Sequence, residues 1–553
     1  MKKKIKFFLF FIFISKNILA NQLQSDIQPE PASIKTNLKK SLEAKDFIVV
    51  TANDYATSIG FEILSEGGNA VDAAVAIQMI LGLVEPQSSG LGGGSFITFF
   101  DKSEGKVYSY EGREKAPKKI KGNIFLKKNG DTKKFFEAAI GGAAVGTPAT
   151  LRTYKLIHNN YGIMNWERIF SYVIEFSKNG FVPSTRLVNA INKERFFFDL
   201  YPDSIYKNIK INPKKKFFNY DYTETLELIS KKPSVFYEGV IADNIVNEVR
   251  KSKNFGYLNK SDLKLYEPEK NYALCHKLKN SKSICGPNLP SSGTICVIQA
   301  LILYESLSKE IDSLDINSVL SILDFVYSLR SETLADDKFE DIDINLLLNE
   351  KELLKRYKNF LKIDEKTSLL SLDELLNSTT HFSVVDKNGN ILSATSSIES
   401  SFGSRLFTNG FFLNNQLTDF SFKMKNSVGG FIKNRVVGGK RPLSSMSPII
   451  VFDENGELVL TIGAPGGKAI IAYVFRVLIE TLYYKIDLEK SLNNPNYLRI
   501  RGRTYLEDKN LKKDLIGSAD IRNLTSGLAV IYKTKDGYLG VADTRRDGTV
   551  MGN

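Results

Sequence analysis

The sequence predicts an α+β fold, in which strand-forming and helix-forming stretches occupy largely separate parts of the chain. Short apolar runs rich in β-branched residues recur near both ends, for example at residues 48–52 and 528–532. Between them, residues 146–265 show mostly the apolar spacing of helices. The composition, 42% apolar and 25% charged, is ordinary for a globular protein with a large core.

Residues 1–20 have the pattern of a secretory signal peptide. A lysine-rich start is followed by an uncharged apolar run at 7–14 and by a small residue, Ala20, after which we expect cleavage. The run is too short to cross a bilayer of about 30 Å as a helix. An uncleaved membrane anchor is the alternative. We therefore expect a periplasmic or secreted protein with no stable membrane span once the leader is removed.

The first part of the mature chain predicts an arm followed by a compact βα unit. Residues 21–45 are polar and contain proline, and we expect an arm that becomes ordered late. A strand is predicted at 48–52 and a helix at 54–65, followed by an Ala-rich, buried helix that begins at Asn69. The glycine cluster at 90–94 precedes a strand instead of following one. It therefore predicts a close-packed turn and not a nucleotide-binding loop.

The middle of the chain is predicted to be mainly helical, and residues 338–378 predict a helix followed by a loose connector. The C-terminal part returns to strands, with one further helix. The expected helices are 150–159, 166–179, 184–200, 241–251, 289–308 and 469–484, and the expected later strands are 449–452, 458–462, 528–532 and 539–542.

We expect the stretch at 377–419 to contain the catalytic nucleophile. Polar residues lead into two threonines, a strand at 382–385, a turn, and a returning strand at 391–395. Cleavage of the Ser378–Thr379 bond would give Thr379 a free α-amino group beside its own hydroxyl, and that amine can serve as the base for a hydroxyl nucleophile. Taken alone, a Thr-Thr pair at the start of a strand is more often only a strand former or a cap.

Four motifs in order make the functional interpretation specific. They are Thr-Thr-His-Phe-Ser-Val-Val-Asp at 379–386, Leu-Asn-Asn-Gln at 413–416, Arg-Pro-Leu-Ser-Ser-Met-Ser-Pro at 441–448, and Gly-Ala-Pro-Gly-Gly at 463–467. In order and spacing the chain resembles γ-glutamyltranspeptidases, which are N-terminal nucleophile hydrolases, over nearly its whole length after the leader. The resemblance implies a four-layered αββα sandwich. It also implies a precursor that cuts itself into residues 21–378 and 379–553, two subunits that form a heterodimer in one intertwined domain.

The resemblance also assigns roles to individual residues. It implies that Thr379 is the nucleophile, that the Ser397 hydroxyl orients it, and that backbone N–H groups at Gly466 and Gly467 form an oxyanion hole. The α-carboxylate of the substrate would be held by Arg113, Ser444 and Ser445. Its ammonium group would be held by Glu399, Gln416 and Asp419. Thr380 and His381 are expected to have supporting roles.

The implied substrates are glutathione and other γ-glutamyl compounds, with water or an amino acid or dipeptide as the acceptor. No cofactor is implied. A cephalosporin (glutaryl) acylase-like amidase on the same fold is one alternative, and a non-catalytic γ-glutamyl-binding protein is another. The tyrosine-bearing lid of some relatives is expected to be absent or shortened after Asp419, which leaves room for a bulkier amide. Glutaryl substrates lack an α-amino group, however, and the acidic pair Glu399 and Asp419 argues against them.

Charge and cysteine content exclude other classes of function. The net charge is +13, but the lysines are scattered along the sequence and no nucleic-acid motif accompanies them. Cys275 and Cys285 flank a short polar connection, and a disulfide between them is possible if their Cα atoms come within about 7 Å. The resemblance supports this pairing. Cys296 lies in an apolar run and is expected to be buried, and three histidines with three cysteines show no metal-ligand spacing.

Overall fold

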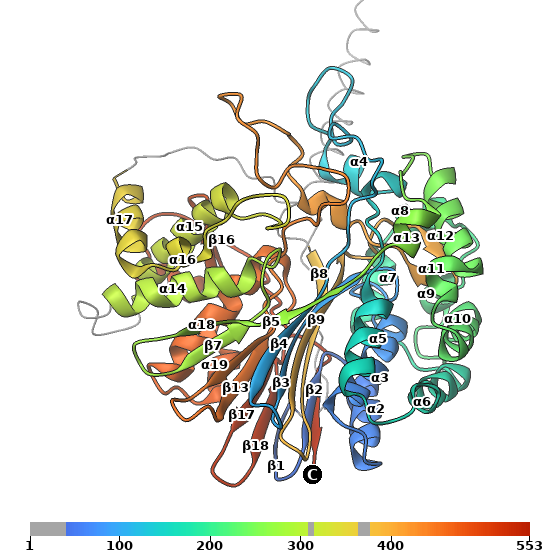
Figure 1. The fold of residues 1–553 in the computed structure, drawn as a ribbon, viewed down its shortest axis with the longest axis horizontal. Helices are drawn as coiled ribbons and strands as arrows, with labels where there is room; N and C mark the ends of the chain where they lie inside the picture. Colours follow the sequence, from blue (N-terminus) through green and yellow to red (C-terminus); the bar gives the residue numbers. More distant parts are fainter. Residues whose placement is uncertain (1–39, 308–314, 363–376) are drawn as a thin grey trace, which may run out of the picture.

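The computed structural model describes residues 40–307, 315–362 and 377–553. Two seven-stranded antiparallel sheets lie face to face, and helices cover the outer face of each (Figure 1). The predicted α+β, four-layered αββα architecture is therefore confirmed. In the described part of the chain, no helix is long and apolar enough to cross a membrane. The predicted leader at 1–20 lies outside the described residues.

Both sheets mix strands from the two sides of the Ser378–Thr379 bond. In the second sheet β8 lies between β2 and β9, so the strand that contains the predicted cleavage site is central and not at an edge. The first sheet has the order β1 (Ser41–Ala44), β18 (Tyr538–Ala542), β17 (Ala529–Lys533), β13 (Leu458–Gly463), β12 (Ile449–Phe452), β7 (Ser283–Gly286) and β6 (Leu274–Lys277). The second has the order β19 (Thr549–Gly552), β2 (Ile48–Thr51), β8 (Asn377–Val385), β9 (Ile391–Ser400), β3 (Gly94–Asp101), β4 (Lys106–Gly112) and β5 (Glu269–Tyr272).

Three large apolar clusters hold the four layers together. One lies between the sheets and includes Val50, Ile450 and Ile531, and the other two join each sheet to its helices. The helices against the second sheet are α2 (Asp54–Ser65), α3 (Ala70–Val84) and α5 (Thr150–Tyr161), and α6 (Trp166–Asn179) packs on the outside of α2 and α3. Those against the first sheet are α14 (Gly293–Leu307) and α18 (Ile470–Leu482), and α15 (Ile316–Thr333) and α17 (Glu350–Phe360) pack on α14.

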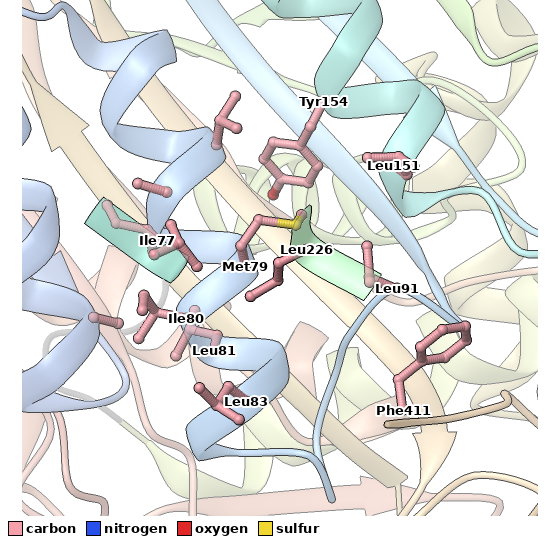
Figure 2. Close-up of a cluster of buried hydrophobic side chains, with 14 of the residues drawn as sticks. Ile77, Met79, Ile80, Leu81, Leu83, Leu91, Leu151, Tyr154, Leu226 and Phe411 are labelled. Atoms are coloured by element: carbon pink, nitrogen blue, oxygen red, sulfur yellow. The ribbon is translucent and has the colours of Figure 1, made fainter. Parts of the chain in front are cut away.

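Helix α3 shows how the sequence produces this packing. Asn69 caps it: its side chain accepts from the N–H groups of Val71 and Asp72, and the Asp72 carboxylate accepts from the Asn69 N–H. All fifteen residues of the helix are buried. Such a helix must be apolar on every side, as the Ala-rich sequence predicts. In Figure 2 its large residues Ile77, Met79, Ile80, Leu81 and Leu83 lie among side chains from other segments, including Leu91, Tyr154, Leu226 and Phe411.

The structure corrects several sequence expectations. The described end of the predicted arm, Ser41–Ala44, forms β1 and pairs with β18. The helix expected at 184–200 is two helices, α7 (Thr185–Lys193) and α8 (Phe196–Leu200), because Glu194 leaves the helical path between them. Its carboxylate accepts from the N–H of Phe197 and pairs with Arg405 at 3.2 Å.

Other elements complete the fold. The predicted Cys275–Cys285 disulfide is present and joins the neighbouring strands β6 and β7, while Cys296 is buried as a free thiol. The expected helix after residue 338 is α16 (Ile344–Leu347) and α17, and residues 363–376 of the expected connector lie outside the described part. Not predicted were α15, α10 (Tyr220–Lys231), and a small third sheet of β14 (Tyr497–Ile500), β15 (Arg503–Leu506) and β16 (Ala519–Ile521).

Candidate active site

Thr379 lies inside β8, two residues after its start, where the sequence had placed it before the strand. Its two neighbours in the sheet, β2 and β9, fix this strand from both sides. The β8–β9 register shifts between Ser378 and Thr379: Ser378 is opposite Glu399, but Thr379 is opposite Ser397. An irregularity of this kind changes the direction in which nearby side chains point. It coincides with the bond that was predicted to be cut.

The Ser397 hydroxyl bridges the two sides of that bond. The Thr379 hydroxyl donates to the Ser397 Oγ at 3.2 Å, and the Ser397 hydroxyl donates to the carbonyl oxygen of Ser378 at 2.7 Å. The same Oγ accepts from the backbone N–H of Glu399 at 2.9 Å. All these groups are buried. The hydroxyl of Ser397 is therefore a hydrogen-bond donor aimed at the carbonyl of residue 378 and an acceptor for the hydroxyl of Thr379.

The glycine-rich turn before β3 packs directly against this part of β9. A Cβ atom on Gly93 would lie 2.1 Å from the Ser397 carbonyl oxygen, and one on Gly92 would lie 2.0 Å from that of Phe412. Only residues without a side chain allow so close an approach. The predicted close-packed turn is present, and it supports the strand that bears Ser397.

Arg113 and Asp419 form an ion pair at one side of the pocket. The guanidinium Nη2 lies 2.6 Å from the Asp419 Oδ2, and the same guanidinium donates to the carbonyl oxygens of Pro442 and Leu443 at 2.9 and 3.0 Å. Arg113 follows β4, and Asp419 ends a 3₁₀ turn, Gln416–Asp419. In this ligand-free pocket the cation expected to bind a carboxylate is paired with an anion expected to bind an ammonium group.

Glu399 is a buried carboxyl group with an unusual backbone. Its φ of 81° lies in the left-handed region, and its side chain is 2% exposed. Asn415 Nδ2 donates to its Oε2. Burial, and then the neighbouring Asp419 charge, raise the pKa of Glu399 to about 8. The carboxyl group is therefore mostly protonated at neutral pH in the empty pocket.

Gln416 lies between these acids and offers an additional acceptor. Its Nε2 donates to the Asp419 Oδ2 at 2.6 Å. Its Oε1 is buried and accepts no hydrogen bond from any residue that the structure describes. A buried amide oxygen in this state favours binding of a donor such as an ammonium group.

One pocket gathers nearly all of the predicted site residues. Ser444 and Ser445 lie in the segment before β12, and Gly466 and Gly467 lie in the turn before α18, where both have positive φ. Gly466 is adjacent to the pocket wall and is not itself part of it. The predicted residues that line the pocket are Arg113, Thr379, Ser397, Glu399, Gln416, Asp419, Ser444, Ser445 and Gly467.

Sequence reasoning missed several residues at the site. Arg330 on α15 and Lys468, which follows Gly467, add two cations to the pocket lining, and Leu443, Met446 and Ile470 add apolar surface. The position of Lys468 beside the Gly-Gly pair was a usable signal. Arg546 Nη1 donates to the Thr379 carbonyl oxygen at 3.2 Å, although 167 residues separate the two, and nothing local in the sequence indicates that contact.

His381 is a packed residue, as expected. Its ring lies against Gly463, its Nδ1 is 2.9 Å from the Thr395 hydroxyl, and its Nε2 is 3.3 Å from that of Ser383. Burial lowers the pKa of His381 to about 3, so the ring stays neutral. Thr380 is fully buried next to it.

The segment that follows Asp419, residues 420–440, is a projecting loop (Figure 1). Residues 420–440 contain no tyrosine. Two isolated β-bridges, Ser421 with Arg435 and Lys425 with Phe431, close the loop on itself. Asn434 fastens its base, because its Nδ2 donates to the carbonyl oxygen of Asp419 at 2.7 Å. The tyrosine is absent from the segment, and the expectation that the segment is shortened relative to some relatives stays a prediction.

The sequence is similar to those of known proteins over most of its length. The sequence profile of the family described as Gamma-glutamyltranspeptidase matches residues 56–553. A glutathione hydrolase proenzyme of Escherichia coli (strain K12) is 31% identical over 497 residues, which cover 85% of this chain and 83% of that protein. A glutathione hydrolase proenzyme of Bacillus subtilis (strain 168) is 28% identical and covers 92% of each chain.

Solved structures show the same fold. A cephalosporin acylase from Bacillus halodurans superposes with a TM-score of 0.79, covering 96% of this chain and 99% of its own, at 20% sequence identity. A γ-glutamyltranspeptidase from Helicobacter pylori gives a TM-score of 0.52 at 26% identity, covering 61% of this chain and 95% of its own. At 20% identity, the likeness to the acylase concerns the fold alone.

Proposed function

Because this chain belongs to the γ-glutamyltranspeptidase family, we propose that it is made as a precursor that cuts itself between Ser378 and Thr379. The two products would be residues 21–378 and 379–553, held together as a heterodimer. The observation that supports this most directly is the hydroxyl of Ser397, which contacts both the Thr379 hydroxyl and the Ser378 carbonyl oxygen.

Self-cleavage follows from these contacts. The Thr379 Oγ attacks the carbonyl carbon of Ser378 while its proton moves toward the Ser397 Oγ. The Ser397 hydroxyl stabilises the negative charge that develops on the carbonyl oxygen. The C–N bond then breaks, the nitrogen takes up a proton, and an ester joins Ser378 to the Thr379 Oγ. Water hydrolyses the ester, leaving the Ser378 carboxylate and the free amine and hydroxyl of Thr379.

The mature activity is that of a γ-glutamyltransferase and glutathione hydrolase. The Thr379 hydroxyl, with its own amine as the base, attacks the γ-carbonyl of a γ-glutamyl amide such as glutathione. The backbone N–H groups of Gly466 and Gly467 would stabilise the oxyanion, and the departing amine takes the proton. Water or the amino group of an amino acid or dipeptide then resolves the γ-glutamyl ester of Thr379.

Substrate recognition would open the Arg113–Asp419 ion pair. The free end of a γ-glutamyl group is a zwitterion, so its carboxylate can take the place of Asp419 at Arg113, assisted by Ser444 and Ser445. Its ammonium group then replaces Arg113 as the partner of Asp419. The Arg113–Asp419 ion pair is then replaced by two ion pairs with the substrate, and neither side chain is left buried without an opposite charge.

The acids around the ammonium position favour γ-glutamyl over glutaryl substrates. An ammonium group beside Glu399 would favour the ionised carboxylate and lower the pKa that burial raises to about 8. The free Oε1 of Gln416 would accept one of its hydrogen bonds. A glutaryl group offers no donor at this position and would leave these acceptors unsatisfied. The acylase interpretation is therefore disfavoured, although the fold is shared.

We also propose that the precursor is exported. A leader cleaved after Ala20 would deliver the precursor to the periplasm or to the outside of the cell, and an oxidising compartment suits the Cys275–Cys285 disulfide.

The test compares purified protein with a Thr379→Ala variant by intact mass, denaturing gel and glutamate release from a γ-glutamyl anilide. We expect two fragments meeting at 378/379 and activity in the natural protein, and one uncut, inactive chain in the variant. A folded natural protein that stays uncut and inactive would leave a binding protein as the better interpretation. Release of a glutaryl group in preference to a γ-glutamyl group would favour the acylase interpretation.

A further inference from the structure

Two lysine-rich segments project from the same end of the molecule. The first is residues 117–137, which follow the Arg113 segment, and the second is the loop 420–440, which follows Asp419. Both rise from the top of the fold in Figure 1, above the start of β8. The first contains seven lysines and two acidic residues, and the second contains four lysines, one arginine and no acidic residue. Lysines that are scattered in the sequence are therefore concentrated here.

The two segments support each other at their bases. The rings of Phe125 and Phe422 stack at a centroid distance of 4.7 Å. Gly122 is close to Met424, since a Cβ on Gly122 would lie 2.4 Å from the Met424 Sδ. The two segments therefore pack against each other and project as one unit.

The end of the loop 420–440 combines cations with exposed apolar side chains. Val428 is 88% exposed and Phe431 is 61% exposed. Lys423 and Lys425 are also exposed, and neither forms an ion pair with any residue that the structure describes. The Lys425 ammonium group lies 5.1 Å from the centre of the Phe431 ring. We call Lys423, Lys425, Val428 and Phe431 the loop tip.

We propose that the loop tip docks on an anionic lipid surface. Apolar side chains at an exposed turn can enter the boundary between headgroups and acyl chains, while lysines beside them attract anionic headgroups. The lysines of residues 117–137, such as Lys118 and Lys121, would add a broader attraction at the same end of the molecule. Residues 420–440 contain no acidic residue. At the base of the loop Arg435 and Lys440 pair with Glu340, so the charge offered to a lipid surface is that of Lys423 and Lys425 at the loop tip.

A soluble acidic peptide is the rival partner, and the geometry disfavours it. None of the loop-tip residues lines the pocket that holds Thr379. Lysines selected for a peptide substrate would be expected at the pocket wall, and an exposed Val428 and Phe431 would serve no purpose. A lipid surface accounts for the charge and for the apolar side chains together.

Vesicle sedimentation tests the proposal with the mature protein, residues 21–553. We expect binding to vesicles that contain phosphatidylglycerol and not to vesicles of phosphatidylcholine alone, with binding falling as salt is added. Val428→Ser with Phe431→Ser, and separately Lys423→Glu with Lys425→Glu, should each weaken binding by about tenfold or more. Turnover of a γ-glutamyl anilide without vesicles should be unchanged and shows that these variants are folded.

A matched control lies elsewhere on the surface. Ile211 is 69% exposed and stands next to the exposed lysines 214 and 215. Ile211→Ser with Lys214→Glu and Lys215→Glu changes charge and apolar surface in a similar way and should leave vesicle binding within about twofold. Equal loss in this control would mean that net charge alone attracts the protein, and the proposal would fail.

Two other results would also overturn it. One is the absence of binding to anionic vesicles by the natural protein. The other is loop-tip variants that bind vesicles normally but have an altered kcat/KM for γ-glutamyl compounds with several carboxylates in the leaving group, which would make an acidic peptide the partner. Neither result bears on the proposed function, because cleavage and turnover of the neutral anilide are measured separately.

Discussion

At the scale of single residues, the proposed self-cleavage depends on the hydroxyl of Ser397. It donates to the Ser378 carbonyl oxygen and accepts from the Thr379 hydroxyl, so its removal takes away both the stabilisation of the developing charge and the acceptor for the proton. Loss of one such donor typically slows a reaction by about 100- to 1000-fold.

We therefore expect Ser397→Ala to accumulate uncut precursor, and Ser397→Thr to be cut at a rate within about tenfold of the natural chain because the hydroxyl is kept. The appearance of the two fragments on denaturing gels over time measures this. Equal cleavage rates in Ser397→Ala and the natural chain would show that the contact is structural only.

Glu399 makes the stability of the protein depend on pH. Its pKa is about 8 in the folded chain because it is buried and near Asp419, whereas an unfolded chain has the ordinary value of about 4. Between these values the folded state holds a proton that the unfolded state has lost, so the free energy of unfolding falls as pH rises from about 5 toward about 8. The slope is at most about 1.4 kcal/mol per pH unit for one group.

A comparison with Glu399→Gln isolates this contribution, because Glu111 and Glu114, whose pKa values burial also raises, remain in both proteins. Both proteins carry Thr379→Ala so that they stay uncut, and urea unfolding is measured at about pH 5 and about pH 8. The free energy of unfolding should fall more between these two pH values in the protein that keeps Glu399 than in the Glu399→Gln variant. The same pH dependence in both proteins would mean that Glu399 is already ionised at the lower pH.

The sequence predicted which residues belong to the site, but it did not predict which of them pair with each other. The family resemblance identified Arg113, Thr379, Ser397, Glu399 and Asp419, and the structure places all of them at one pocket. Order along the chain cannot say that Arg113 and Asp419 pair with each other before substrate arrives. Contacts such as Arg546 with Thr379 join distant segments, so they have no local pattern to reveal them.

At the scale of elements, the glycine-rich turn before β3 positions β9. A methyl group at Gly93 would overlap the Ser397 carbonyl oxygen, so β9 would have to shift where it bears the Ser397 hydroxyl. We expect Gly93→Ala to lower the free energy of unfolding by about 1–3 kcal/mol and to slow self-cleavage. Urea unfolding and the gel assay measure the two effects.

Gly105→Ala is the matched control. Gly105 lies between β3 and β4 with φ of 64°, and no atom of the described residues lies within 4 Å of an added Cβ atom, so this change adds only the cost of a left-handed backbone. It should leave the cleavage rate unchanged. A cleavage defect as large in Gly105→Ala as in Gly93→Ala would mean that the glycine-rich turn does not determine the position of Ser397.

Local patterns predicted elements well where one signal dominated. Asp54–Ser65 and Trp166–Asn179 begin and end where apolar spacing and caps indicated. The secondary-structure predictions were wrong where a contact with a residue distant in the sequence determines the local structure. Glu194 interrupts a predicted helix to reach Arg405, and Ser41–Ala44 is a strand only because β18 offers an edge.

At the scale of the whole molecule, the proposed cleavage would not divide the protein. Strand β8 pairs with β2 on one side and β9 on the other, and β19 pairs with β2, so strands from before and after Thr379 are hydrogen-bonded to each other in one sheet. We expect the two fragments to copurify without denaturant and to unfold in one transition. Size-exclusion chromatography and calorimetry measure this. Fragments that separate in native buffer would contradict it.

The closeness of the C-terminus to the first described strands has a consequence for how an active enzyme could be made. The N–H groups of Lys45 and Asp46 donate to the carbonyl oxygen of Asn553, at 2.9 and 2.6 Å. A linker that runs the length of β1, about 17 Å for five strand residues, could therefore join residue 553 to residue 40, and the chain could be reopened before Thr379. Such a circular permutant would gain its nucleophilic amine when the initiator methionine is removed, and maturation would no longer require the protein to cut itself.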